Sequence, residues 1–402
     1  AEGTNAAARE TLSALYRVAY TTAHPSTCLP PFLPPVPAGG RIIIIGAGKG
    51  SAAMAVATER HYIAAGLGGK ISGLISTRHG FGLATEIIKI LEAGHPVPDA
   101  NSIQGAKIAI ELAKSAGPND LVLCLLSGGA SALWSAPVDG VSFESKQQLT
   151  KQLLKSGAPI SEMNCVRKHL SRIKGGKLAA AAHPASLLTV AISDVPGDHP
   201  DEIGSGPTVA DRTTLAEASA VLARWNITPA QEIAAALNDA NNETLKAGDP
   251  KLSSSNYKIV AAPKASLEAA AKLAREKGYR VDVLGDSLEG EARQVAAFHA
   301  AMALDAKRRG EKLAIMSGGE LTVTVKGNGS GGPNQEYALG LAIALNGTSG
   351  ICGLAGDTDG TDGGAGSADD PAGAMVFPDT LQRAAAKNQN AANFLENNDS
   401  SG

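Results

Sequence analysis

Aromatic residues are scarce in this sequence: they make up 3% of its 402 residues, whereas glycine occurs 46 times. Hydrophobic residues still amount to 44%, so we expect aliphatic, alanine-rich cores joined by many tight turns. A chain of this length is long enough for two domains of ordinary size.

Several other features are missing. The four cysteines, at positions 28, 124, 165 and 352, have no CxxC spacing, so no zinc site or disulfide framework is implied, which fits a reducing cytoplasm. No apolar run reaches the roughly 18–20 residues needed to span a membrane, and the N-terminal residues have no apolar signal core. We therefore expect a cytoplasmic protein with no membrane partner.

Positive charge is not in excess either. Lys and Arg total 36 against 39 Asp and Glu, so the net charge is −3, and there is no long basic run. This balance argues against nucleic acid or an anionic membrane as a partner. The sequence does not determine the oligomeric state, although it is compatible with a homodimer.

The order of hydrophobic and helical segments predicts an α/β protein. A helical segment at 4–20 and a proline-rich connector at 24–40 come first. Alanine-rich helical stretches then alternate with aliphatic runs, which favours crossover units and a mostly parallel sheet. The aliphatic runs lie at 41–45, 71–76, 87–91, 121–126 and 187–192, and the helical stretches at 51–66, 100–116 and 144–156.

A polar, turn-rich stretch at 238–256 separates a second α/β region. We predict two domains, 1–240 and 241–402, with the boundary between about 225 and 255. Helices are expected at 264–277, 289–309 and 333–346 of the second domain. Whether the first helix packs on the second domain stays open at this stage.

The turns that follow the predicted strands share one composition: glycine with Ser, Lys or Asp. Ligands of open parallel sheets bind beyond the carboxyl ends of the strands. Backbone amides at glycine turns bind anions, and aspartate at a strand end can hold a divalent cation. The turns read "GAGKGS", "SGGASALW", "SDVPGDHPDEIGSGP", "SGGE" and "GDTDGTDGG".

The first of these turns matches no standard nucleotide motif. Gly46, Gly48 and Gly50 form GxGxG rather than the GxGxxG of dinucleotide-binding folds, and the next strand ends at Arg78 instead of an acidic residue. A Walker P-loop fails as well, because Lys49 is followed by glycine. A purely structural turn is the plain alternative, but a lysine in such a turn favours an anionic ligand.

Two further segments carry candidate functional residues. In "MNCVRKHLSRIKGGKLA", Asn164, Arg167, Lys168 and Ser171 have the spacing of one helical face, flanked by His169 and Lys174. Such a face could bind a carboxylate or phosphate, or be a solvated basic surface.

Asp194 directly follows an apolar strand, so it is the acid of its loop that we expect to be buried and functional. The stretch "GDTDGTDGG" does not fit an EF-hand, because its glycine and terminal glutamate are not where that loop needs them. No HxH or HExxH spacing supports a transition-metal site.

These motifs, in this order, resemble the class II glycerate kinase family, whose C-terminal half is the MOFRL domain and whose members are often also labelled hydroxypyruvate reductase. The resemblance extends from about residue 8 to 390. It is carried by "GAGKG", "AGHPVPD", "SGGASALW", "NCVRKHLSRIKGGKLA", "SDVPGDHPDEIGSGPTVAD", "SGGELTV", "GGPNQEYALGLA" and "AGDTDGTDG".

The resemblance implies an N-terminal Rossmann-like domain, a smaller C-terminal α/β MOFRL domain, and an active site in the cleft between them. It also implies phosphoryl transfer from ATP to the 2-hydroxyl of D-glycerate with Mg²⁺. Lys49 would neutralise the transferred phosphoryl group, and Asp194 would hold Mg²⁺ or accept the hydroxyl proton. Ser127, Asn164, Arg167 and Lys168 would bind the substrate. The residues expected to bind the nucleotide are Gly46, Gly48, Gly50, Gly128, Gly129, Ser131, Gly318, Gly319 and Glu320.

The sequence departs from the family pattern in two places. Pro333 stands where many members carry arginine, so another cation, Arg167 or Lys168, would have to serve. The family also usually continues with a short segment beyond the point where this sequence ends. An NAD(P)H-dependent hydroxypyruvate reductase, with Arg78 contacting a 2′-phosphate, is the alternative enzyme, and a metabolite sensor is a third interpretation.

Overall fold

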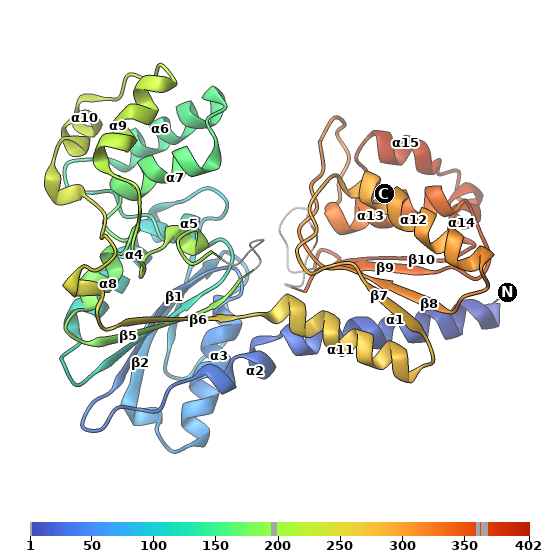
Figure 1. Cartoon of the computed structure of the whole chain (residues 1–402), viewed down its shortest axis with the longest axis horizontal. Helices are drawn as coiled ribbons and strands as arrows, with labels where there is room; N and C mark the ends of the chain where they lie inside the picture. The colour runs from blue at the N-terminus through green and yellow to red at the C-terminus, as the bar shows by residue number, and fades with distance from the viewer. Residues whose placement is uncertain (1, 194–198, 359–361, 363–368) are drawn as a thin grey trace. The chain divides into compact units, whose positions relative to one another are not determined.

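The structure is a computed structural model that describes residues 2–193, 199–358, 362 and 369–402. The chain forms two compact units (Figure 1). The sheet unit is Leu29–Val260, and the terminal unit combines Ala1–Cys28 with Ala261–Gly402. This division falls later in the chain than the predicted boundary at 240/241, because the strand that ends at Val260 belongs to the sheet of the first unit.

Within the described residues, the sheet unit contains one six-stranded parallel sheet in the order β3-β2-β1-β4-β5-β6. The order reverses direction between β1 and β4, and ligands of doubly wound sheets bind at such a switch point. The predicted Rossmann-like, mostly parallel sheet is confirmed. The strands are β1 (Ile42–Ala47), β2 (Ile71–Arg78), β3 (Lys89–Ala93), β4 (Leu121–Leu126), β5 (Ser186–Ile192) and β6 (Ser255–Val260).

Strand β1 is buried along its whole length because helices cover both sides of the sheet (Figure 1). Ile43 and Ile45 face a core that α4 (Ala100–Ser115) and α8 (Lys177–Ala182) complete. Ile42 and Ile44 point the other way and are also fully buried, and α3 (Ser51–Ala64) packs against β2 and β4. Burial on both faces explains why this strand is a continuous apolar run.

A cluster of helices with its own core belongs to the same unit and is formed by the chain segments between β4 and β5 and between β5 and β6 (Figure 1). Leu149 and Leu153 from one helix pack there with Val166 and Val221 from two others. Its helices are α6 (Phe143–Ser156), α7 (Ile160–His169), α9 (Leu215–Arg224) and α10 (Gln231–Leu237). The remaining helical turns of the unit are α5 (Ala130–Leu133) and the 3-10 turns Pro30–Phe32, Gly68–Lys70, Ile203–Ser205, Ala240–Asn242 and Pro250–Leu252.

The terminal unit is a smaller α/β assembly that includes the first helix. Helix α1 (Glu2–Ala23) packs along α11 (Ala262–Glu276), and Ser266 donates a 2.8 Å hydrogen bond to the carbonyl oxygen of Ala19. Strands β7 (Arg280–Val283) and β8 (Leu313–Met316) pair in parallel, and β9 (Gly353–Gly356) and β10 (Gly373–Val376) pair antiparallel. The other helices are α2 (Pro25–Cys28), α12 (Ala292–Arg308), α13 (Pro333–Leu345), α14 (Thr380–Ala386) and α15 (Ala391–Glu396).

Two further features of the chain are the lengths of its apolar helices and the state of its cysteines. Over the described part of the chain, no helix is both long and apolar enough to cross a bilayer. All four cysteines are free thiols.

Candidate functional site

The turns after β1 and β4 are joined to each other at the switch point of the sheet. The amide of Lys49 donates a 2.8 Å hydrogen bond to the carbonyl oxygen of Gly128, and the amide of Ser127 donates to Ala47 at 3.2 Å. The hydroxyl of Ser127 accepts a further hydrogen bond from the amide of Gly50 at 3.0 Å. The two turns are therefore one structural feature, in which each fixes the other.

The glycines of the first turn allow this close approach. Gly48 has φ +149°, and a β-carbon there would overlap the hydroxyl of Ser127. A β-carbon at Gly46 would overlap the carbonyl oxygen of Leu125 on β4. The amides of Gly48, Lys49 and Gly50 all donate within the protein, to Ser76, Gly128 and Ser127. The part of this turn that can meet an anion is thus the Lys49 side chain rather than a cradle of amides.

The second turn has amides available. Gly129 has φ +84° and is the N-cap residue of α5. No residue that the structure describes accepts a hydrogen bond from the amides of Gly128, Gly129 or Ala130. A β-carbon at Gly129 would lie 3.2 Å from Cγ of Lys49 and 2.8 Å from Nε2 of His95, so both side chains lie against this turn. The turn therefore combines unpaired amides with an adjacent lysine, which suits an anionic ligand.

His95 was not among the predicted site residues. It follows β3 in the stretch "AGHPVPD", one of the stretches that carry the family resemblance. Its position next to the Gly129 turn depends on the neighbouring positions of β3, β2, β1 and β4 in the sheet. That juxtaposition is not visible in the sequence.

A buried lysine in the turn between α7 and α8 contacts α5. Lys174 is 2% exposed, and its Nζ donates to the carbonyl oxygen of Ser131 at 2.7 Å and to the Ser131 hydroxyl at 3.1 Å. The hydroxyls of Ser131 and Ser205 are 2.8 Å apart. Ser131 was predicted to bind the cofactor, and the structure ties its side chain to Lys174 and Ser205.

The predicted basic face of 163–179 is divided between two environments. Asn164, Arg167 and Lys168 lie on α7, but the helix ends at His169, so Ser171 is not on that face. The Ser171 hydroxyl instead accepts hydrogen bonds from the amides of Ile173 and Lys174. The prediction of one continuous helical face is therefore wrong at Ser171, because the chain turns there before α8.

Lys168 and His169 are engaged by acids. Nζ of the buried Lys168 lies 3.4 Å from Oδ1 of Asp211, and Nε2 of His169 lies 2.7 Å from Oε1 of Glu243. Asp211 also accepts hydrogen bonds from the hydroxyls of Thr213 and Thr244. An ion pair built this way holds α7 to the segments around it, so Lys168 is not available as a carboxylate clamp in this arrangement.

Arg167 faces a different set of groups. It forms no ion pair or hydrogen bond with any residue in the described ranges, and its charge acts on the buried Lys146 and Lys174. Burial, together with the charges of Arg167 and Lys177, lowers the pKa of Lys146 to about 7. Burial, together with the charges of Lys146 and Arg167, lowers the pKa of Lys174 well below its usual range. We refer to the buried Lys146 and Lys174, together with the partly buried Arg167, as the buried cationic cluster.

The glycine turn predicted in the terminal unit is paired with a neighbouring loop. The amides of Gly318 and Glu320 donate to Gly285 and Leu288, and the amide of Leu288 donates back to Gly318. A β-carbon at Gly319 would overlap the Leu288 backbone, which explains the glycine there. The assignment of Gly318, Gly319 and Glu320 to a nucleotide site stays a prediction.

Pro333 is the first residue of α13, where its missing amide costs no hydrogen bond. Asp362, which is 2% exposed, accepts hydrogen bonds from the amides of Asn334 and Gln335. This residue of the "GDTDGTDGG" stretch therefore holds the start of α13. Asp194, which we predicted as a catalytic and metal-binding residue, lies outside the described residues.

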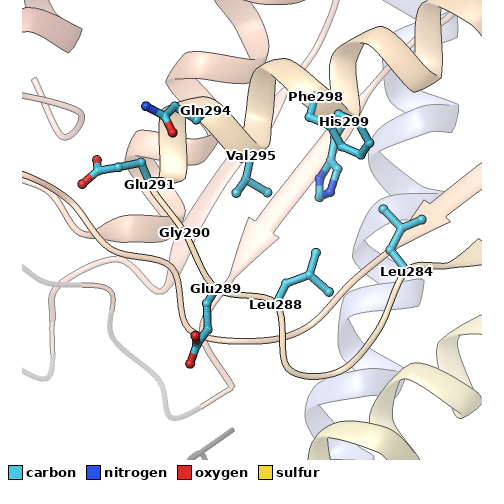
Figure 2. A pocket seen from close by; sticks show the side chains of 9 residues that line it. All are labelled: Leu284, Leu288, Glu289, Gly290, Glu291, Gln294, Val295, Phe298 and His299. Carbon is cyan, nitrogen blue, oxygen red and sulfur yellow. The ribbon is translucent and has the colours of Figure 1, made fainter. Parts of the chain in front are cut away.

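The terminal unit also contains a pocket of about 500 Å³ (Figure 2). Leu284, Leu288 and Val295 provide apolar lining, and Glu289 and Glu291 contribute carboxylates. His299 also lines it, with Nδ1 2.7 Å from the hydroxyl of Tyr337. Carboxylates without a lysine or arginine in the lining disfavour an anionic ligand, so this pocket is not our candidate site.

The chain matches two family models. Residues 11–238 match the domain of unknown function DUF4147, and residues 313–402 match the MOFRL family. It is 47% identical to a putative hydroxypyruvate reductase of Agrobacterium vitis, over 94% of this chain and 84% of that protein. It is 39% identical to the D-glycerate 2-kinase of Thermotoga maritima, over 90% of this chain and 84% of that protein.

A crystal structure of glycerate kinase from Thermotoga maritima superposes with a TM-score of 0.85 at 37% identity, covering 100% of this chain and 93% of that one. The fold and the paired turns define an α/β protein with a candidate anion site at the switch point of its parallel sheet. The chain belongs to the class II glycerate kinase family, with a DUF4147 domain followed by a MOFRL domain.

Proposed function

We propose that this protein transfers the γ-phosphoryl group of ATP to the 2-hydroxyl of D-glycerate, which produces 2-phosphoglycerate and ADP. The observation that carries the proposal is the position of the Lys49 side chain against a turn whose Gly128, Gly129 and Ala130 amides are unpaired among the described residues. Relatives named D-glycerate 2-kinase and glycerate kinase support the substrate and the reaction type.

Phosphoryl transfer requires mainly positioning and neutralisation of charge. The Lys49 ammonium would neutralise charge that develops on the transferred group, and the three amides would bind its oxygens. Both reactants are anions, so the buried cations near Ser131 favour their binding. The protein's contribution is therefore a fixed positive environment rather than covalent chemistry.

Mg²⁺ is proposed because it is the usual partner of nucleotide phosphates and is typically held by one or two carboxylates together with those phosphates. Among the described residues, no group of three His, Cys, Asp or Glu side chains could hold a metal ion. Asp194 remains the predicted protein ligand, and it lies outside those residues. Four free cysteines accord with the cytoplasmic location that we propose.

A hydroxypyruvate reductase is the second candidate, favoured by the names of two relatives that are 47% and 43% identical. The β1 turn offers little to a dinucleotide, because its three amides are already hydrogen-bonded within the protein. Arg78, at the end of β2, lies with its guanidinium carbon 3.6 Å from the centre of the Phe81 ring. An acidic residue in this region of the fold would have favoured the ribose of NAD.

Two assays on one purified sample test the choice. The first follows ADP formation from ATP, Mg²⁺ and D-glycerate, and identifies which hydroxyl is phosphorylated. The second follows oxidation of NADH and NADPH with hydroxypyruvate. We expect 2-phosphoglycerate in the first assay and no nicotinamide oxidation in the second. Nicotinamide oxidation without ADP formation would establish the reductase instead.

A further inference from the structure

Lys146 is buried without a partner. It lies on α6, is 7% exposed, and its Nζ has no hydrogen-bond acceptor among the residues that the structure describes. Lys151 and Lys155 on the same helix are exposed. Burying an unpaired ammonium group is costly, and an apolar residue would pack at such a position without that cost. The lysine therefore needs an explanation other than packing.

The charges around Lys146 do not compensate for its burial. Arg167 and Lys177 both act on it as like charges, and Arg167 and Lys146 act in the same way on Lys174. The acids that act on Lys177 are engaged with other residues, Asp211 with Lys168 and Glu243 with His169 and Lys246. Within the described residues, the buried cationic cluster thus has no acid paired with it, and an anionic group of the right size would stabilise its lysines in their charged form.

The burial of the cluster and its contact with Ser131 limit what that anion can be. Its lysines are buried, so a small group can reach them more readily than a triphosphate. Lys174 connects the cluster to Ser131, in the turn beside Lys49. An acceptor molecule bound between the cluster and Ser131 would have one end at the cluster. Its other end would lie near the turn where we place the phosphoryl group.

We propose that Lys146, together with Arg167, binds the carboxylate of the acceptor substrate. This inference rests on the proposed function, in which the acceptor is a small 2-hydroxy acid. Lys146 is then a substrate-binding residue that distinguishes a carboxylate-bearing acceptor from a neutral one. The substrate's carboxylate would then neutralise the charge of Lys146, which offsets the cost of burying this lysine.

The test compares Lys146→Met with Lys151→Met, an exposed position on the same helix. In Lys146→Met we expect KM for D-glycerate to rise about 10–100-fold, the range for losing a charged hydrogen bond. KM for ATP should change less than about twofold, and Lys151→Met should match the wild type. The preference of the enzyme for D-glycerate over its amide, D-glyceramide, should fall by a similar factor, because the amide has no charge for Lys146 to neutralise.

Three outcomes would overturn the inference while the kinase function stands. These are an unchanged KM for D-glycerate, a rise confined to KM for ATP, and an unchanged preference for D-glycerate over D-glyceramide. If the wild type does not phosphorylate D-glycerate, the proposed function fails first, and calorimetry with sodium D-glycerate alone then decides the inference. Binding to the wild type that Lys146→Met abolishes would support an anion subsite at Lys146, and equal or absent binding in both proteins would refute it.

Discussion

The amide of Lys49 donates a 2.8 Å hydrogen bond to the carbonyl oxygen of Gly128, which joins the turn after β1 to the turn after β4. This bond uses the amide that a phosphate-binding loop would offer, and it orients the Lys49 side chain toward the second turn. The carbonyl of Gly128 is occupied while its amide stays unpaired within the described residues. The bond therefore separates the roles of the two turns: the first supplies a cation, and the second supplies amides.

Lys49→Ala tests the role of the cation. We expect kcat to fall about 10²-fold or more, because a contact that strengthens in the transition state is lost. KM for D-glycerate should change little. Steady-state kinetics of the variant beside Lys70→Ala, an exposed lysine immediately before β2, provides the measurement and its control. A near-normal kcat in Lys49→Ala would remove this residue from the catalytic machinery.

Gly48→Ala tests the packing of the two turns. The added methyl group would overlap the Ser127 hydroxyl at a backbone φ of +149°, so we expect a loss of about 1–3 kcal/mol in the free energy of unfolding together with reduced kcat. Urea denaturation and kinetics measure both effects. Gly69→Ala, where no atom lies within 4 Å, should behave like the wild type. A stable, fully active Gly48→Ala protein would contradict the interlocked turns.

Lys168→Met tests whether Lys168 has a structural role. Removing the lysine leaves the buried Asp211 carboxylate without its ion-pair partner, with only the Thr213 and Thr244 hydroxyls bound to it, so we expect a loss of about 3–5 kcal/mol in unfolding free energy. The double variant Lys168→Met with Asp211→Asn should recover much of that loss. Lys272→Met, which removes a surface pair with Glu276, should change stability by less than about 0.5 kcal/mol.

The substrate role of Lys168 would be revived by a different result. If Lys168→Met left the stability unchanged but raised KM for D-glycerate, the lysine would be a ligand of the acceptor. Our interpretation of the Lys168–Asp211 pair would then be wrong.

Lys146→Met should stabilise the unliganded protein. The pKa of Lys146 falls from 10.5 to about 7 on folding because of burial and the charges of Arg167 and Lys177. The unfolded chain then binds more protons than the folded protein between these values, so the contribution of Lys146 makes stability rise as pH increases from about 7 toward 10.

The free energy of unfolding of the wild type should therefore rise more steeply with pH than that of Lys146→Met. The two slopes should differ by at most about 1.4 kcal/mol per pH unit. The pKa values of Lys174 and Lys177 are also lowered, so these two lysines make stability rise with pH in both proteins. Urea denaturation of the two proteins at several pH values measures the difference. Identical slopes, or a less stable Lys146→Met protein at neutral pH, would contradict this account.

Much of the sheet unit could be predicted from the sequence. The apolar run that starts at Ile42 indicated a strand buried on both faces, and the predicted strands and helices of this unit occur close to their expected positions. The boundary between the units could not be placed as well, because β6 looks like any other short strand until its pairing with β5 is known. Nothing local to α1 indicated that it packs on α11.

The sequence by itself determined the alternating α/β pattern, the glycine turns after the strands and Lys49 as a candidate cation, since these depend on local periodicity and residue type. Only the tertiary structure decided that the glycines at 46 and 48 serve close packing, that Lys168 is paired with Asp211, and that Lys146 is buried beside Arg167 and Lys174. The reason is physical. Whether an amide is already bonded, or a charge already paired, depends on groups far away in the sequence that folding brings together.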